Sequence, residues 1–296
     1  MTGARPSGTL RDWLRYAERR FRAAHLHYGH GTHTARDEAA WLLAHVLRLP
    51  HEQLEAALDR TLTPAERRKA QRLIDDRART RRPLAYLLHE AWLGEHRFYV
   101  DERVIVPRSF IAELLRDGLR PWIAQPGRVR RALDMCTGSG CLAVLLALTF
   151  PRATVDAADI DQGARAVARR NVRDYKLGRR VRLLRSDLFA GLPAAQYDLI
   201  VANPPYVDAR AMKMLPREYR HEPKLALAGG ADGLRFVKAI LRDARDFLGP
   251  HGLLVVEIGH NRRMLERAFP GVPFTWLETS AGDEFVFLLQ RGQLPR

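Results

Sequence analysis

The sequence predicts an α/β fold, in which a doubly wound and mostly parallel sheet follows a small helical domain. From Arg130 onward, short apolar runs alternate with longer patterns of helical spacing. This alternation is typical of parallel strands joined by crossover helices. Earlier in the chain, residues 9–82 repeat apolar side chains only at helical spacing. We therefore expect a helical N-terminal domain at 1–82, a β-hairpin linker at 83–110 and an α/β domain at 111–296.

The expected elements of the α/β domain follow from its apolar runs. Strands are expected at 131–135, 154–159, 181–186, 197–202, 252–258, 274–279 and 284–289. Helices are expected at 141–149, 163–175, 233–248 and 261–268. The last two strands leave no room for a helix, so Gly282-Asp283 is expected to form the turn of a hairpin. The sheet would then have seven strands, the last of them antiparallel.

Local signals organise the first part of the chain. Thr63-Pro64-Ala65-Glu66 matches a helix start, with Thr at the N-cap, Pro at the first helical position and Glu two positions later. Ala91–Val106 is rich in apolar and aromatic residues around Asp101-Glu102, which predicts a hairpin with an acidic turn. Pro107-Arg108-Ser109 then precedes a helical stretch. It is compatible with a helix cap, which we favour, or with a segment that covers a site.

Composition limits the class of protein. The hydrophobic fraction of 46% is normal for a globular chain, and the N-terminus lacks the apolar core of a signal peptide. Two cysteines are too few for a disulfide framework. We expect a soluble cytoplasmic protein without membrane contact. The net charge of +15 favours nonspecific RNA contact, but the scattered arginines fit a bias of base composition equally well.

A glycine-containing segment predicts a nucleotide-like cofactor. Asp134–Ala143 follows an expected strand and opens a helix, with Cys136, Thr137, Gly138, Ser139 and Gly140 in between. Glycines there let a backbone approach a ligand at the positive end of the helix dipole. The spacing fits a nicotinamide cofactor as well as S-adenosyl-L-methionine.

Acidic residues at successive strand ends narrow the choice of cofactor. Asp134 precedes the glycines, where it would repel a pyrophosphate but suit an amino-bearing ligand. Asp159 ends the next strand, where a carboxylate accepts hydrogen bonds from ribose hydroxyls. Asp187, followed by Leu188, is placed to read an adenine amine, unless it only caps a helix. The three carboxylates favour S-adenosyl-L-methionine.

The segment Asn203-Pro204-Pro205-Tyr206 carries the expected chemistry. It follows an apolar strand without a spacer, so these residues would lie at the carboxyl edge of the sheet, where ligands bind. The Asn203 side-chain oxygen and the Pro204 carbonyl can both accept hydrogen bonds from one NH2 group. Tyr206 can stack on the planar group that carries it. The segment therefore predicts a site for an amide or amino nitrogen.

Histidines gather at His25, His27, His30 and His33, but neither cysteines nor carboxylates complete a metal-ligand set, and glycines interrupt the run. No metal is expected. Cys136 and Cys141 are interpreted as small packing residues.

Taken together, Asp134-x-x-Thr-Gly-Ser-Gly-Cys and Asn203-Pro-Pro-Tyr resemble the HemK-type protein glutamine methyltransferases. The resemblance covers nearly the whole chain. It implies a Rossmann-like class I S-adenosylmethionine-dependent methyltransferase sheet. The residues Val106–Ser109, Met135–Thr137, Glu218–Pro223 and Pro273–Glu278 depart from the release-factor branch and look like the branch known as PrmB, which modifies ribosomal protein L-three of the large subunit.

The resemblance also implies roles for residues. Cys136–Gly140 would line the methionine part of the cofactor, Asp159 would bind the ribose, and Asp187-Leu188 the adenine. Asn203 and the Pro204 carbonyl would hold the glutamine NH2, with Tyr206 on the amide plane. His221 and Glu222 are candidates for accepting a proton, although a surface-loop role is favoured for both.

Other functions stay open at this point. The alternatives within methyl transfer are a release-factor glutamine and an exocyclic amine of an RNA or DNA base. The two outside it are a non-catalytic binding or assembly role that kept the fold, and nicotinamide-dependent dehydrogenation. The helical domain suits recognition of a protein substrate, either free ribosomal protein L-three or an assembly intermediate of the ribosome.

Overall fold

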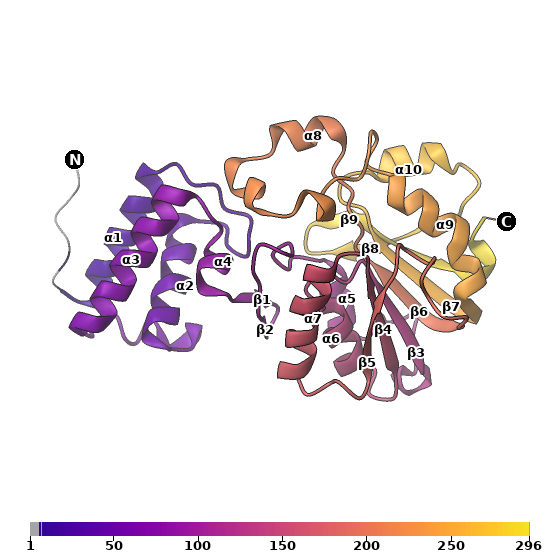
Figure 1. The fold of residues 1–296 in the computed structure, drawn as a ribbon, viewed down its shortest axis with the longest axis horizontal. Helices are drawn as coiled ribbons and strands as arrows, with labels where there is room; N and C mark the ends of the chain where they lie inside the picture. The colour runs from indigo at the N-terminus through magenta and orange to yellow at the C-terminus, as the bar shows by residue number, and fades with distance from the viewer. Residues whose placement is uncertain (1–5, 7, 296) are drawn as a thin grey trace. The chain divides into compact units, whose positions relative to one another are not determined.

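The computed structural model describes residue 6 and residues 8–295, and the chain divides into two units (Figure 1). The helical unit runs to Glu90 and also includes Pro216–His221. The sheet unit comprises Ala91–Leu215 and the chain from Glu222 onward. Over the described residues, no helix combines the length and the apolar character that crossing a membrane requires.

Four α-helices form most of the helical unit in its described residues. They are α1 (Leu10–Ala23), α2 (Ala35–Leu47), α3 (Pro64–Thr80) and α4 (Leu84–Leu88), with short 3-10 turns η1 (His51–Gln53) and η3 (Arg217–His221). The predicted start of α3 is confirmed: Thr63 Oγ1 accepts from Glu66 N at 3.3 Å, and Glu66 Oε2 accepts from Thr63 N at 2.8 Å. This reciprocal pair satisfies backbone donors that the first turn leaves open.

The helical unit extends to Glu90, beyond the expected boundary at residue 82. Pro83 does not end the helical region, because it lies at the N-cap of α4, where a proline interrupts no helical hydrogen bond. Leu84, Ala85 and Tyr86 then bury their side chains completely or almost so. Burial of this apolar turn is the reason that it belongs to the helices rather than to the linker.

A buried ion pair joins α2 and α3. The Arg77 side chain is fully buried, and its Nε donates to Glu38 Oε1 at 2.5 Å. Glu218 of η3 is equally buried and accepts from Arg81 Nη2 at 2.8 Å and from His27 N at 3.0 Å. Because a charge away from water requires a partner, these residues depend on one another.

The predicted sheet is confirmed in the sheet unit, with seven strands among the described residues. They are β3 (Arg131–Met135), β4 (Thr154–Asp159), β5 (Val181–Arg185), β6 (Tyr197–Ala202), β7 (Leu248–Glu257), β8 (Thr275–Thr279) and β9 (Gly282–Gln290). The order across the sheet is β5-β4-β3-β6-β7-β9-β8. Strand β9 is antiparallel to both of its neighbours, and the pairs from β5 to β7 are parallel.

Helices cover both faces of the sheet (Figure 1). One layer contains α5 (Ile111–Arg116), α6 (Cys141–Thr149) and α7 (Gln162–Asp174), and the other α9 (Arg235–Phe247) and α10 (Arg262–Ala268). Neighbouring strand residues alternate between two cores: Ala132 packs into the first and Leu133 into the second. Burial on both sides explains why the central strands are continuous apolar runs. The remaining elements are α8 (Ala209–Met214) and 3-10 turns η2 (Pro126–Arg128), η4 (Lys224–Ala226) and η5 (Arg291–Gln293).

Two predicted turns are misplaced. The linker hairpin pairs β1 (Ala91–Leu93) with β2 (His96–Phe98), so its turn is Gly94-Glu95 and the prediction of Asp101-Glu102 is wrong. Gly94 has φ +61°, a conformation that glycine adopts without strain. At the second hairpin the turn residues are Ser280 and Ala281, and Gly282-Asp283 already begins β9.

We predict that Glu38→Ala destabilises the protein by about 3 kcal/mol, because the buried Arg77 guanidinium loses the carboxylate that its Nε binds and keeps, among the described residues, only Glu218, at 3.9 Å, as a charged partner. Urea unfolding followed by circular dichroism and tryptophan fluorescence measures the change. The matched control is Asp76→Ala, whose pair with Arg79 is largely exposed and should be worth less than about 1 kcal/mol. Equal effects of the two substitutions would contradict this account of the buried pair.

Candidate functional site

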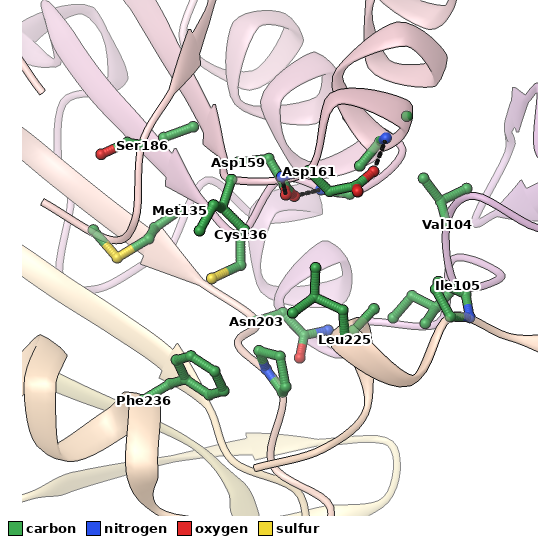
Figure 2. A pocket seen from close by; sticks show the side chains of 18 of the residues that line it. Val104, Ile105, Met135, Cys136, Asp159, Asp161, Ser186, Asn203, Leu225 and Phe236 are labelled. Atoms are coloured by element: carbon green, nitrogen blue, oxygen red, sulfur yellow. Dashed lines mark hydrogen bonds between the residues drawn. The ribbon is translucent and has the colours of Figure 1, made fainter. Parts of the chain in front are cut away.

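A cavity of about 300 Å³ lies where the central strands of the sheet end (Figure 2). This volume is at the lower end of the range for small-molecule sites. Its walls are made by the segments that follow β3, β4, β5 and β6, by the linker after β2, and by η4 and the first turn of α9. In Figure 2, Asp159 and Asp161 lie on one side of the cavity, and Asn203 and Phe236 on the other.

Strand register brings the predicted residues together. Met135 on β3 lies opposite Ala158 on β4 and Ala202 on β6. The next residues along these strands are Cys136, Asp159 and Asn203, and all three line the cavity. Of the residues predicted to bind the cofactor, those in the cavity wall are Cys136, Gly138, Asp159, Asp187, Leu188 and Asn203. Asp134, Thr137, Ser139 and Gly140 do not line it.

The segment after β3 turns tightly at the cavity, where Cys136 and Gly138 line the wall. Cys136 and Gly138 have φ values of +59° and +54°, in the left-handed region. Gly140 caps α6 at φ +77°, and a Cβ there would lie 2.9 Å from the Cβ of Ala168 on α7. The glycine is required at this position by conformation and by close packing at once.

Asp134 stabilises this segment from within the protein. Its carboxylate is fully buried, and Oδ2 accepts from Thr137 Oγ1 at 2.5 Å and from Ala143 N at 2.9 Å. Burial raises the pKa of Asp134 to about 7. Its contacts fix the loop and the first turn of α6.

Asn171 of α7 holds the same segment from another side. This buried amide donates from Nδ2 to the Ser139 carbonyl at 2.8 Å and to the Tyr99 carbonyl at 3.0 Å, and Oδ1 accepts from Tyr99 N at 2.8 Å. The glycine-containing loop after β3 and the linker are thus both hydrogen-bonded to one side chain. Sequence reasoning missed Asn171, and its only signal was a polar residue on the buried face of a helix.

Asp159 presents its carboxylate at the cavity. Oδ2 accepts from Gly138 N and Oδ1 from Asp161 N, each at 2.9 Å. Burial is the main cause that raises the pKa of Asp159 above its ordinary value. Since each carboxylate oxygen accepts more than one hydrogen bond, Asp159 retains acceptor capacity for hydroxyl groups of a ligand.

After β5, a compact turn places Asp187 and Leu188 in the cavity wall. Ser186 Oγ donates to the Leu188 carbonyl at 2.5 Å and accepts from Gly191 N at 2.9 Å. Leu188 has φ +48°. Asp187 is exposed, and Leu188 is half-buried. An acidic and an apolar side chain thus lie next to each other at this end of the cavity.

After β6, the Asn-Pro-Pro-Tyr segment contributes Asn203 and Pro205 to the cavity. Asn203 is half-buried, and within the described residues no backbone or side-chain group hydrogen-bonds its amide. Pro204 is buried, and Tyr206 is half-buried outside the cavity wall. An amide at a cavity wall with both its donors and its acceptor available is suited to binding a polar ligand.

Apolar residues from distant segments complete the cavity, and sequence reasoning missed them. They are Val104 and Ile105 of the linker, Pro223, Leu225 and Ala226 around η4, and Phe236 of α9 (Figure 2). Leu225 is 54% exposed. These residues belong to no sequence motif. They line the cavity only because the fold brings the linker, η4 and α9 close together.

The residues around Pro107 are anchored by two buried glutamates. Arg108 donates to both Glu222 oxygens, at 2.6 and 2.7 Å, and Glu222 also accepts from Val106 N at 2.9 Å. Ser109 Oγ donates to Glu257 at 2.6 Å and accepts from the N–H of Ile111, the first residue of α5, at 3.2 Å. The predicted helix cap is nevertheless wrong in its position, because the N-cap residue is Phe110, which makes no side-chain cap. Glu222 is only 3% exposed, so its predicted surface-loop role is wrong. Glu222 can be buried because the Arg108 guanidinium binds its carboxylate and compensates its negative charge.

Neither cysteine is set up as a nucleophile. Burial is the main cause that raises the pKa of both thiols, to about 12 for Cys141. Nearby carboxylates act in the same direction for Cys136. Both side chains therefore stay thiols at neutral pH, and only the thiolate is strongly nucleophilic. Among the described residues, His, Cys, Asp and Glu side chains form no group of three suited to a metal ion.

Comparisons with known proteins identify relatives over nearly the whole chain. Residues 119–218 match the methyltransferase small domain, and residues 12–88 match the PrmC N-terminal domain. Ribosomal protein uL3 glutamine methyltransferases are 57% identical in Neisseria meningitidis serogroup A and 54% identical in Bordetella pertussis. Each alignment covers 97% of this chain, and 94% and 96% of those proteins. The relative of the same name from Burkholderia pseudomallei is 52% identical over 99% of this chain and 98% of its own.

A solved structure shows a similar fold at much lower identity. The catalytic domain of hMettl16, in complex with the MAT2A 3′UTR hairpin 6, has a TM-score of 0.50 and 18% identity. The comparison covers 76% of this chain and 80% of that one. This likeness concerns the arrangement of the sheet and its helices.

The pKa of Asp134 predicts how stability depends on pH. Because the folded protein holds this proton up to about pH 7 and the unfolded chain loses it near pH 4, the free energy of unfolding should fall as pH rises between these values. The slope contributed is about 1.4 kcal/mol per pH unit. Asp134→Asn should flatten the dependence in urea unfolding at pH 5, 6, 7 and 8, whereas the exposed control Asp174→Asn should not. Parallel curves for wild type and Asp134→Asn would contradict the assignment.

Proposed function

Because the chain belongs to the family of ribosomal protein uL3 glutamine methyltransferases, we propose that it methylates the side-chain amide nitrogen of a glutamine in uL3, which is protein L-three of the large subunit. The methyl donor in this proposal is S-adenosyl-L-methionine. The observation that carries the proposal is the available amide of Asn203 at the cavity wall, one residue beyond β6 and level with Asp159.

The cavity residues fit this cofactor. Asp159 retains acceptor capacity for ribose hydroxyls, and Asp187 beside Leu188 offers a carboxylate and an apolar surface to an adenine. Cys136 and Gly138 line the part of the cavity where the methionine part would lie. Bound there, the cofactor supplies a methyl group already activated on a sulfonium. The apolar residues Val104, Ile105 and Phe236 would exclude water from it.

Asn203 and Pro204 would orient the substrate. An amide nitrogen is a poor nucleophile, since its lone pair is delocalised into the carbonyl. Asn203 Oδ1 and the Pro204 carbonyl would accept the two N–H bonds and hold the nitrogen toward the methyl group. The same acceptors would stabilise positive charge that develops on the nitrogen. Tyr206 would pack on the amide plane.

The two ionisable candidates near the motif, Glu222 and His221, are both engaged by other groups. Glu222 is engaged by Arg108 and by Val106 N. The Nε2 of His221 lies 3.1 Å from the Thr80 carbonyl, so this ring nitrogen is also engaged. The proton would therefore leave to water after methyl transfer, when the nitrogen no longer shares its lone pair with the carbonyl.

The partner in this proposal is a ribosomal protein, and the helical unit is its recognition domain. A cytoplasmic location and a substrate within a ribosome assembly intermediate both fit such a partner. The surplus of basic residues would favour nonspecific contact with ribosomal RNA.

Labelled S-adenosyl-L-methionine, incubated with the enzyme and separated ribosomal proteins and RNA, tests the function. We expect label on uL3 at a glutamine located by mass spectrometry. Asn203→Ala should reduce transfer by at least about a hundredfold through lost positioning, while calorimetry still detects cofactor binding. Label only in RNA, or undiminished transfer by Asn203→Ala, would reject the proposal.

Asp159→Ala should weaken binding of S-adenosyl-L-methionine by about tenfold or more, because two charge-assisted hydrogen bonds to ribose are lost. Isothermal calorimetry measures the change. Asp174→Ala on the exposed surface of α7 is the control and should bind as wild type does. A thermal melt of each variant separates lost affinity from lost folding. Unchanged affinity in Asp159→Ala would remove Asp159 from the cofactor site.

A further inference from the structure

Tyr206 lies against three glycines that come from two later segments of the chain. Gly229 and Gly233 lie between η4 and α9, and Gly259 follows β7. A Cβ built on Gly259 would lie 2.6 Å from Cε2 and 2.8 Å from Cδ2 of Tyr206. Real side chains do not approach so closely. The Tyr206 ring therefore packs directly on the backbone of Gly259, and any larger residue there would displace the ring.

The backbone of Tyr206 is enclosed in the same way. A Cβ on Gly229 would lie 2.7 Å from the Tyr206 Cα, and one on Gly233 would lie 2.5 Å from its carbonyl oxygen. Both contacts involve backbone atoms, which cannot move aside as a flexible side chain can. The next residue is held too, since Val207 N donates to the Leu227 carbonyl and Gly229 N to the Val207 carbonyl.

One side chain completes this enclosure. Asn261 Nδ2 donates to the Tyr206 carbonyl oxygen at 2.9 Å. Asn261 occupies the N-cap of α10, where an asparagine ordinarily accepts a hydrogen bond from the first turn of the helix. Here it makes no such cap, and its amide is directed to Tyr206 instead. Asn261 therefore stabilises the position of the Tyr206 carbonyl rather than the first turn of α10.

We propose that Asn261 is a positioning residue for methyl transfer. It holds the Tyr206 backbone while Gly259 leaves room for the ring, so the two residues together set the surface against which the substrate amide packs. Neither residue lines the cavity, and both act through Tyr206. The inference rests on the proposed function, which gives the Tyr206 ring its contact with the substrate.

Asn261→Asp is the sharpest test, because it preserves shape and replaces the donor with an acceptor that repels the Tyr206 carbonyl. We expect turnover to fall by at least about tenfold, while the dissociation constant of S-adenosyl-L-methionine stays within about twofold. The position of the Tyr206 ring is measured separately, from the fluorine NMR resonance of 3-fluorotyrosine incorporated at position 206. That resonance should shift in Asn261→Asp and also in Gly259→Ala.

Gly94→Ala is the matched control for Gly259→Ala. The two glycines have similar φ values, +61° and +55°, but the Cβ at 94 would meet nothing nearer than 4.0 Å. The control therefore introduces the same backbone strain without a clash, and neither turnover nor the resonance at 206 should change. If Gly259→Ala fails to fold, Asn261→Asp alone still tests whether Tyr206 is held in position, because that substitution adds no volume.

The outcomes separate this proposal from the proposed function. An unmoved resonance in Asn261→Asp overturns the positioning role whatever happens to turnover, and so does a moved resonance with wild-type turnover. A moved resonance with reduced turnover and unchanged cofactor affinity supports it. If the wild-type enzyme labels no ribosomal protein, the proposed function fails, and the resonance alone then decides whether Asn261 holds Tyr206.

Discussion

The pairing of β3 with β4 and β6 is the constraint on which the site depends. Parallel strands in register end at one level, so Cys136, Asp159 and Asn203 leave the sheet together although they are far apart in sequence. The strand order also reverses here, since β4 follows β3 on one side and β6 lies on the other. The segments that follow β3 and β6 therefore run to opposite sides, which opens a crevice between them. The cavity lies in that crevice.

The central strands could be predicted because their side chains are buried on both faces, which gives continuous apolar runs. The edge they form was predictable as well, because parallel strands all end at the same edge of the sheet. Turns were less predictable. Asp101-Glu102 has the composition of a turn, yet Asp101 is bound by Tyr99 and Arg103, and the hairpin closes at Gly94. Composition alone does not distinguish an acidic residue in a turn from one held by its neighbours.

Buried charges were the least predictable feature, because their partners lie far along the chain. Glu218 and Glu222 occupy one short segment that reads as a polar loop. Both are nevertheless almost completely buried, Glu218 beside Arg77 and Arg81 in the helical unit and Glu222 beside Arg108 in the sheet unit. Either glutamate would be unstable there without its arginine. Only the folded arrangement shows that this segment provides an anchor to each unit.

The two motifs combine residues that face the cavity with residues that hold the segment in place, and sequence cannot separate them. In the glycine-containing loop, Cys136 and Gly138 line the cavity, whereas Thr137 binds Asp134 and the Ser139 carbonyl binds Asn171. In the second motif, Asn203 faces the cavity and Tyr206 is fixed by Asn261. A flexible loop would have to be ordered each time a ligand binds, at a cost in affinity. Buried Asp134, Asn171 and half-buried Asn261 reduce that cost in advance, and so the precision of the site depends on polar side chains that do not line the cavity.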